Sequence, residues 1–112
     1  MNFATEEIAE GAGVIVTVPG SHLDASNVRS FREALQPLIE AHSAVLIDLR
    51  QIEFIDSSGL GSLLSVLRNL NNKQGELKLF GMSKPVQAMF ELVRMHRLFA
   101  IYNTREEALA TL

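Results

Sequence analysis

The stretch Ala44-Val45-Leu46-Ile47-Asp48-Leu49 is an apolar run relieved by a single charged residue. A strand with one face in water alternates polar and apolar side chains, and this run lacks that alternation. It is therefore typical of a central strand that is covered on both faces. Because helices usually cover a strand of this kind, the run predicts helical segments on either side of it in the sequence.

On the N-terminal side of this run, two segments predict a β-hairpin. Val14 to Val18 is rich in β-branched residues and is followed by Pro19-Gly20, which favours a strand ending in a turn. Phe3 to Ile8 can pair with this strand across a turn at Gly11-Ala12-Gly13. Later strands are joined through helices and so tend to lie parallel, which makes the predicted sheet a mixed one.

The segment after the hairpin predicts an amphipathic helix that ends near Ala41. Either Asp24 or Ser26 can serve as its N-cap. Pro37 lies inside the helical pattern, where a proline typically costs ~3 kcal/mol, so we expect a kink or break at residues 33–36. The apolar residues at helical spacing are Val28, Phe31, Leu35, Leu38 and Ile39.

After the central strand, the pattern alternates between helices and strands. A loop from Arg50 to Asp56 leads into the best-defined helix, and Gly75 marks its end. Ser83 is the expected cap of a helix with Pro85 in its first turn and a buried face of Val86, Met89, Phe90 and Val93. The remaining elements are strands from Leu77 to Phe80 and from Leu98 to Tyr102, and a helix capped by Thr104 that runs through Leu109 and Leu112.

This order predicts an α/β fold for one domain over residues 1–112, with a mixed central sheet of about four to five strands and about four helices. A chain of 112 residues with 47% hydrophobic residues suits one compact core. The longest apolar stretches fall far short of the ~20 residues that span a bilayer, so no membrane insertion is expected.

Charge and cysteine usage narrow the classes of function. The net charge is -3 without a dense block of Lys and Arg, so nucleic acid is not an expected partner. The chain has no cysteine, which excludes disulfides and thiolate chemistry and agrees with a reducing compartment. The acidic N-terminus lacks the pattern of a signal peptide, and a cytoplasmic location is expected.

The segment Ile55-Asp56-Ser57-Ser58-Gly59-Leu60-Gly61 carries the most informative chemistry. It joins a loop to a helix, so one serine is expected to cap the helix while its hydroxyl stays exposed. Gly59 and Gly61 each cost ~1 kcal/mol in a helix relative to Ala. Two interpretations remain open: the glycines allow another molecule to approach closely, or Asp56 or Ser57 is an ordinary N-cap and the glycines ease packing.

The run from Val45 to Leu49 followed by Phe54-Ile55-Asp56-Ser57-Ser58-Gly59-Leu60-Gly61 resembles the signature of the STAS domain family, and specifically of bacterial anti-sigma factor antagonists. Leu23-Asp24, Ser83-Lys84-Pro85-Val86 and Leu98-Phe99 fall in the order of that family, so the resemblance covers nearly the whole chain. The Asp-Ser-Ser-Gly-Leu-Gly run is its specific part, whereas each of the other pieces is weak alone.

The resemblance implies a phosphorylation-controlled binding module. In the family, the serine directly after the aspartate accepts phosphate from a partner that is both an anti-sigma factor and an ATP-dependent serine kinase. That residue is Ser57 here, whereas Ser58 is expected to help cap the helix. The implied partner-binding residues are Asp24, Asp56, Ser58, Gly59, Leu60 and Gly61.

Under this hypothesis the unphosphorylated protein binds the kinase, the phosphorylated protein is released, and a phosphoserine phosphatase resets the switch. For Asp24, a plain N-cap is an equally good interpretation. The chain departs from the family at Pro37 and at Met95-His96-Arg97, where the family often has a glycine and where these cations can complement a helix C-terminus.

Other classes of function fit less well. Ser57 does not lie in a Gly-x-Ser-x-Gly pattern, and His22, His42 and His96 stand in unrelated segments, so neither a catalytic residue nor a metal site is expected. Leu64 occupies the place of the third glycine of a dinucleotide fingerprint, and no cofactor is expected. The main alternative is another STAS role, as a scaffold or accessory subunit in a signalling assembly, with a phosphatase or cyclase partner, or in a lipid transporter.

Overall fold

A five-stranded mixed sheet forms the centre of the molecule in the computed structural model, which describes residues 1–112. In spatial order its strands are β1 (Ala4–Ile8), β2 (Gly13–Thr17), β4 (Ala44–Asp48), β6 (Glu76–Phe80) and β7 (Ala100–Tyr102). The first pair is antiparallel and forms the predicted hairpin, closed by the short 3-10 helix η1 (Ala9–Gly11). The other three pairs are parallel, so their C-terminal ends meet at one end of the sheet.

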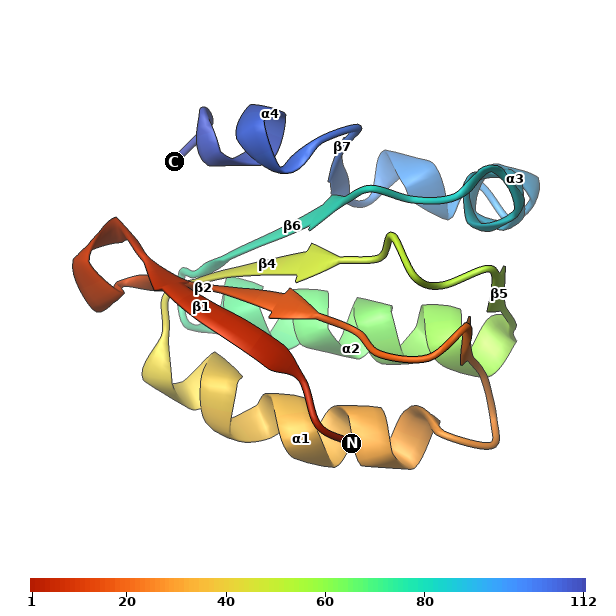
Figure 1. The fold of residues 1–112 in the computed structure, drawn as a ribbon, viewed down its shortest axis with the longest axis horizontal. Helices are drawn as coiled ribbons and strands as arrows, with labels where there is room; N and C mark the ends of the chain where they lie inside the picture. The colour runs from red at the N-terminus through yellow and green to blue at the C-terminus, as the bar shows by residue number, and fades with distance from the viewer.

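Helices cover the two faces of this sheet unequally (Figure 1). The helices are α1 (Val28–Ala41), α2 (Ser57–Asn72), α3 (Lys84–Leu92) and α4 (Arg105–Leu109), with the 3-10 turn η2 (Met95–Arg97) after α3. Both α1 and α2 lie under one face, α4 lies on the other, and α3 lies beyond the C-terminal ends of the strands (Figure 1). The observed α/β architecture confirms the predicted fold class, with a mixed sheet and four helices.

The core divides in the same way. A cluster of 22 buried residues fills the space between the sheet and the α1/α2 layer and extends to α3. A smaller cluster of five, including Leu46 and Phe80 from the sheet and Ala108 from α4, lies on the opposite face. All five residues of β4 are buried, as the unbroken apolar run at positions 44–48 predicts.

Of the kink or break predicted at residues 33–36, the break is wrong. Helix α1 is continuous across this residue, and Phe31, Leu35 and Ile39 all pack into the core. Pro37 lies on the exposed side of the helix, where water can hydrogen bond to the carbonyl group that loses its partner. The packing of the buried face therefore outweighs the local cost of the proline.

Three predictions for the segment from 83 to 102 also need correction. Ser83 occupies the N-cap position of α3, but its hydroxyl donates to the carbonyl oxygen of Ile52, 2.9 Å away, and makes no cap hydrogen bond. Val93 is half-exposed rather than buried, because α3 ends at Leu92 and Arg94 turns the chain with a φ of 61°. The last strand consequently begins at Ala100, two residues later than predicted.

At the opposite end of the sheet, Lys73 joins the two long helices. The ammonium group of this residue, just past the end of α2, donates to the carbonyl oxygens of Ile39, Glu40 and His42 at 2.7, 3.3 and 3.2 Å. Helix α2 is terminated by a left-handed Gln74 (φ 63°) and a hydrogen bond of 2.7 Å from the Gly75 N–H to the carbonyl oxygen of Leu70. Gly75 is thus the predicted stop, although its neighbour takes the left-handed conformation.

Candidate functional site

A second, two-stranded sheet positions the candidate site beyond the C-terminal ends of the parallel strands. It consists of β3 (His22–Leu23) and β5 (Phe54–Ile55), paired in parallel with Leu23 opposite Ile55. The sequence predicted only a loop at β5, because two residues are too few to show a strand pattern. This pairing places the next residues on each strand, Asp24 and Asp56, side by side.

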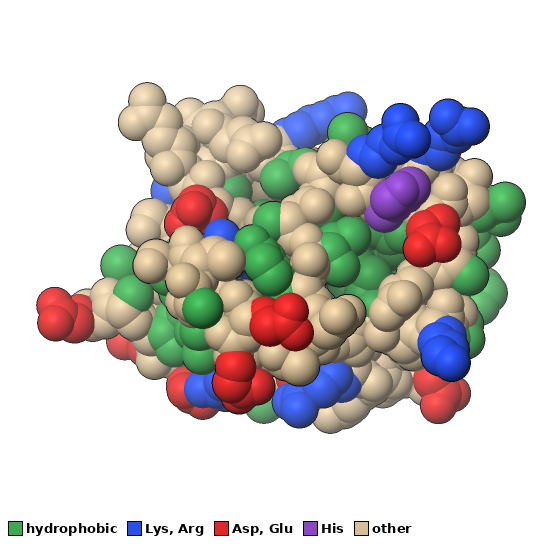
Figure 2. All heavy atoms as spheres, turned by 90° about the horizontal axis from the view of Figure 1, so that it is seen from above, with side chains coloured by type: hydrophobic (Ala, Val, Ile, Leu, Met, Phe, Trp, Pro, Cys, Tyr) green, Lys and Arg blue, Asp and Glu red, His purple; other side chains and the backbone are tan.

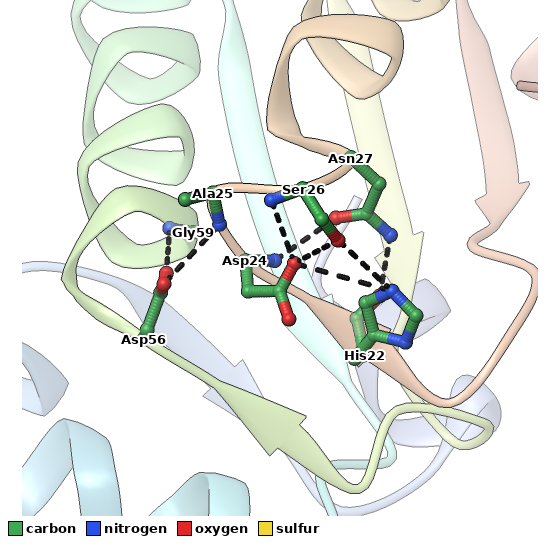
Figure 3. Close-up of polar contacts among 7 residues, drawn as sticks. All are labelled: His22, Asp24, Ala25, Ser26, Asn27, Asp56 and Gly59. Atoms are coloured by element: carbon green, nitrogen blue, oxygen red, sulfur yellow. Dashed lines mark hydrogen bonds and ion pairs between the residues drawn. The ribbon is translucent and has the colours of Figure 1, made fainter.

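Asp56 is the N-cap of α2. Its Oδ1 accepts a hydrogen bond of 2.9 Å from the Gly59 N–H, and its Oδ2 accepts one of 3.2 Å from the Ala25 N–H (Figure 3). One carboxylate therefore both caps the helix and ties the 24–27 turn to it. The predicted capping role of Ser58 is wrong, because Asp56 already occupies the cap position.

Asp24 organises the neighbouring turn through its own carboxylate. Its Oδ1 accepts hydrogen bonds from the hydroxyl and the N–H of Ser26, at 2.5 and 2.9 Å, and lies 3.9 Å from Nε2 of His22 (Figure 3). The hydroxyl of Ser26 is the main cause of a lowered pKa of Asp24, so this carboxylate is charged at neutral pH. Its side chain is about one-quarter exposed, at 23%.

Neither Asp24 nor Ser26 is the N-cap of α1. The helix begins at Val28, and Asn27 is its N-cap. The Asn27 amide bridges the turn instead. Its Oδ1 accepts from the Asp24 N–H at 2.9 Å, and its Nδ2 donates to the His22 carbonyl oxygen at 2.8 Å. Sequence reasoning missed Asn27, although Asp and Asn, here three residues apart, are both typical turn residues.

Ser57 is the first residue of α2 and is exposed. Its hydroxyl takes no part in the cap, which the Asp56 carboxylate forms alone. The N–H groups of a first helical turn and the helix dipole favour negative charge at this position. The geometry can therefore accommodate an anion on Ser57 without loss of a hydrogen bond within the chain, whereas Ser58 beside it is half-buried.

The two glycines of the segment differ. A Cβ at Gly59 would lie 2.3 Å from the carbonyl oxygen of Leu23 and 2.7 Å from Cγ1 of Ile55, so the β3–β5 sheet packs directly on this residue. A Cβ at Gly61 would meet nothing within 4 Å. The packing interpretation thus accounts for Gly59, and it does not account for Gly61, which faces open space.

The predicted partner-binding residues therefore fall into two groups. Asp24, Asp56, Ser58 and Gly61 are at least partly accessible around Ser57. Gly59 and Leu60 are buried, with Leu60 only 3% exposed, and they hold the helix against the core. No group of three or more His, Asp or Glu side chains is arranged to hold a metal ion.

Residues 4–108 of this chain match the sequence profile of the STAS domain family. The anti-sigma-B factor antagonist of Listeria monocytogenes is 30% identical over 108 residues, which cover 96% of this chain and 95% of that protein. None of the helices combines the length and apolar character that crossing a membrane requires.

Two solved structures share the fold. A candidate anti-sigma factor antagonist of Thermotoga maritima superposes with a TM-score of 0.88 at 22% identity, covering 97% of this chain and 92% of that chain. The Bacillus cell fate determinant SpoIIAA in its phosphorylated form gives a TM-score of 0.70 at 23% identity, with 98% of each chain covered. On the profile match and the identity to the Listeria protein, this chain belongs to the STAS domain family.

Proposed function

We propose that this protein is an anti-sigma factor antagonist that is switched by phosphorylation of Ser57. The observation that carries the proposal is an exposed hydroxyl at the first position of α2, left free by the Asp56 cap and bordered by the turn that holds Asp24. Relatives named as anti-sigma factor antagonists support the class of partner. SpoIIAA, which has a similar fold, has been described in both unphosphorylated and phosphorylated forms.

The unphosphorylated protein binds an anti-sigma factor that is also a serine kinase. The contact surface consists of Ser57 with the accessible residues Asp24, Asp56, Ser58 and Gly61. Gly61 leaves room for close approach of a partner, because its position has no neighbouring atoms within 4 Å of a Cβ. Gly59 and Leu60 act from behind this surface, by fixing the start of α2 against β3 and β5.

Phosphorylation changes the surface and leaves the fold intact. A phosphoserine adds roughly -1.5 to -2 charges, and a helix N-terminus stabilises such a group. The same charge lies beside Asp56 and near the ionised Asp24 on a protein that already carries a net charge of -3. Repulsion and bulk at the interface then release the partner, and a phosphoserine phosphatase restores binding.

Phosphate transfer tests the proposal directly. The purified chain is incubated with radiolabelled ATP and the serine kinase with which it co-purifies from its own organism, and the labelled residue is identified by mass spectrometry. Wild type and Ser58→Ala are expected to incorporate about one phosphate per chain, and Ser57→Ala none. Labelling of Ser57→Ala to the wild-type level would overturn the assignment of Ser57.

Partner affinity tests the direction of the switch. Ser57→Asp is expected to bind the same kinase at least about tenfold more weakly than wild type, a loss of about 1.4 kcal/mol. Asn69→Asp, at an exposed position of α2, provides the matched control for added charge. Equal affinity of wild type and Ser57→Asp would contradict control by surface charge. Whether the released protein is a sigma factor or another regulator is read from what the kinase binds when this chain is absent.

A further inference from the structure

The surface formed by α3, η2 and the start of β7 has features that the Ser57 site does not explain. Five large apolar side chains of the chain are exposed, and three of them lie within seven residues: Leu92, Val93 and Leu98, at 78%, 48% and 54%. Arg94 and Arg97 stand between them in the sequence. We call these five residues the 92–98 patch.

A hollow opens beside this patch. It has a volume of about 220 Å³. Its apolar lining comes from Met82, Phe90 and Ile101, and its polar lining from Gln87, Glu91, His96 and Asn103. An apolar cavity of ~150 Å³ holds a benzene molecule, so this hollow has room for one bulky side chain. Figure 2 shows hydrophobic side chains at the floor of a hollow on this face, with basic side chains nearby.

The charge of this region is opposite to that of the rest of the chain. Residues 84–97 contain three of the 10 Lys and Arg residues but one of the 13 Asp and Glu residues. The chain as a whole is acidic, with a net charge of -3. Exposed apolar side chains rimmed by charge are typical of a docking surface, and the local cations select an acidic partner.

We propose that this surface is a second docking site, which binds an acidic peptide segment of a partner protein through one bulky apolar side chain. The apolar side chain enters the hollow, Leu92 and Leu98 cover it, and carboxylates of the segment pair with Arg94 and Arg97. None of these residues belongs to α2 or to the 24–27 turn, although α3 packs against β5, the strand that leads into Asp56.

An anionic membrane is a poorer fit to the same residues. Membrane-binding basic clusters use about 4–8 Lys and Arg residues, each worth roughly 1 kcal/mol. The 92–98 patch has two. A concave hollow with polar lining also suits a defined side chain better than a lipid surface.

A phage-displayed library of random 12-residue peptides tests the proposal. Peptides are selected for binding to the wild-type protein and then depleted of those that also bind the Gln87→Trp variant, whose larger side chain fills the hollow. Enriched peptides are expected to combine Asp or Glu with Leu, Phe, Ile or Met. Their amide shift changes in heteronuclear NMR should fall on residues 82–103. No enrichment over background, or enrichment of peptides without acidic residues, would overturn the proposal.

Variants of the full chain then separate the possible causes. Arg94→Glu with Arg97→Glu should weaken the best selected peptide at least about tenfold, and Leu92→Ser should weaken it severalfold. The matched controls Arg68→Glu, on the exposed side of α2, and Leu112→Ser should bind as wild type does. Ser57→Asp should also bind unchanged, so this test does not depend on the proposed switch.

Two further measurements identify other occupants. The first is co-sedimentation of the wild-type protein with phosphatidylserine vesicles. A higher affinity for the vesicles than for any selected peptide would replace the proposal with a membrane site. Concentration-dependent self-association that the Arg94→Glu, Arg97→Glu variant abolishes would replace it with a contact between copies of this chain. Neither vesicle binding nor self-association is expected at the protein concentrations at which the selected peptide is fully bound.

Discussion

The first turn of α2 has two faces that differ in nearly every physical respect. On one face Gly59 and Leu60 are buried against β3, β5 and the core. On the other face Ser57 and Gly61 are exposed, with open space at the position that a Gly61 side chain would take. One continuous motif therefore contains both residues that build the site and residues that present it. Substitutions on the two faces should separate stability from binding.

The largest effect is expected for Gly59→Ala. The added Cβ would overlap the carbonyl oxygen of Leu23, a backbone atom that cannot move without breaking the β3–β5 pairing. We expect a loss of about 3 kcal/mol in the free energy of unfolding, at the upper end of what overpacking costs. Urea denaturation followed by circular dichroism measures it. A loss below about 1 kcal/mol would show that the two strands are less tightly packed than the structure indicates.

Asp56→Ala should come next. It removes the cap hydrogen bond to Gly59 and the link to Ala25, and loss of an N-cap typically costs about 1–2 kcal/mol. Asp56→Asn is the matched control, because Asn caps helices about as well as Asp while it lacks the charge. Thermal melting should therefore show a clear drop for Ala and a small one for Asn. Equal drops would assign the effect to charge.

Gly61→Ala should have the opposite sign. Replacing an exposed helical glycine by alanine stabilises a helix by about 0.5–1 kcal/mol, and nothing obstructs the new methyl group. Affinity for the kinase partner should fall in the same variant if the partner approaches this position closely. In this one variant the free energy of unfolding should therefore rise in a denaturation assay while the affinity for the partner falls in a binding assay. A destabilised Gly61→Ala would remove the contrast between the two faces.

The smallest change in stability is expected for Ser57→Asp, at about 0.3–1 kcal/mol in the stabilising direction. A carboxylate in the first turn interacts favourably with the helix dipole, and the Ser57 hydroxyl is not part of the cap that would be lost. The effect should shrink at high salt, because the site is exposed. Chemical denaturation at low and high ionic strength measures both. Marked destabilisation would mean that the serine hydroxyl has a structural role.

Much of the fold could be predicted because its signals are long and regular. The apolar run at 44–49 indicates a doubly covered strand, and the apolar spacing after Leu60 indicates a helix over several turns. The failures have a local character. Pro37 has a real local cost to the helix. Whether α1 stays continuous is nevertheless decided by the packing of its buried residues against core residues that are far away in the sequence.

The candidate site was predictable in its residues but not in its assembly. The sequence pattern indicated an exposed serine hydroxyl at a helix start, and the resemblance selected Ser57 and added Asp24 and Asp56. The strands β3 and β5 gave no pattern because each has only two residues, and their pairing joins segments 32 residues apart. For the same reason, the sequence could not tell whether Asp56 or a serine caps α2, or that the Ala25 N–H would share the Asp56 carboxylate.

Lys73 has a consequence for how the molecule opens. Its ammonium group binds three carbonyl oxygens around the end of α1, so the last turn of α1 cannot unwind without releasing a residue fixed to α2. In amide hydrogen exchange, the C-terminal turns of both helices should then be exposed to solvent deuterium together, with one common opening free energy. The start of α2 is tied to the turn before α1 by a different group, the Asp56 carboxylate, so exchange at that end should report the loss of this link and not of Lys73.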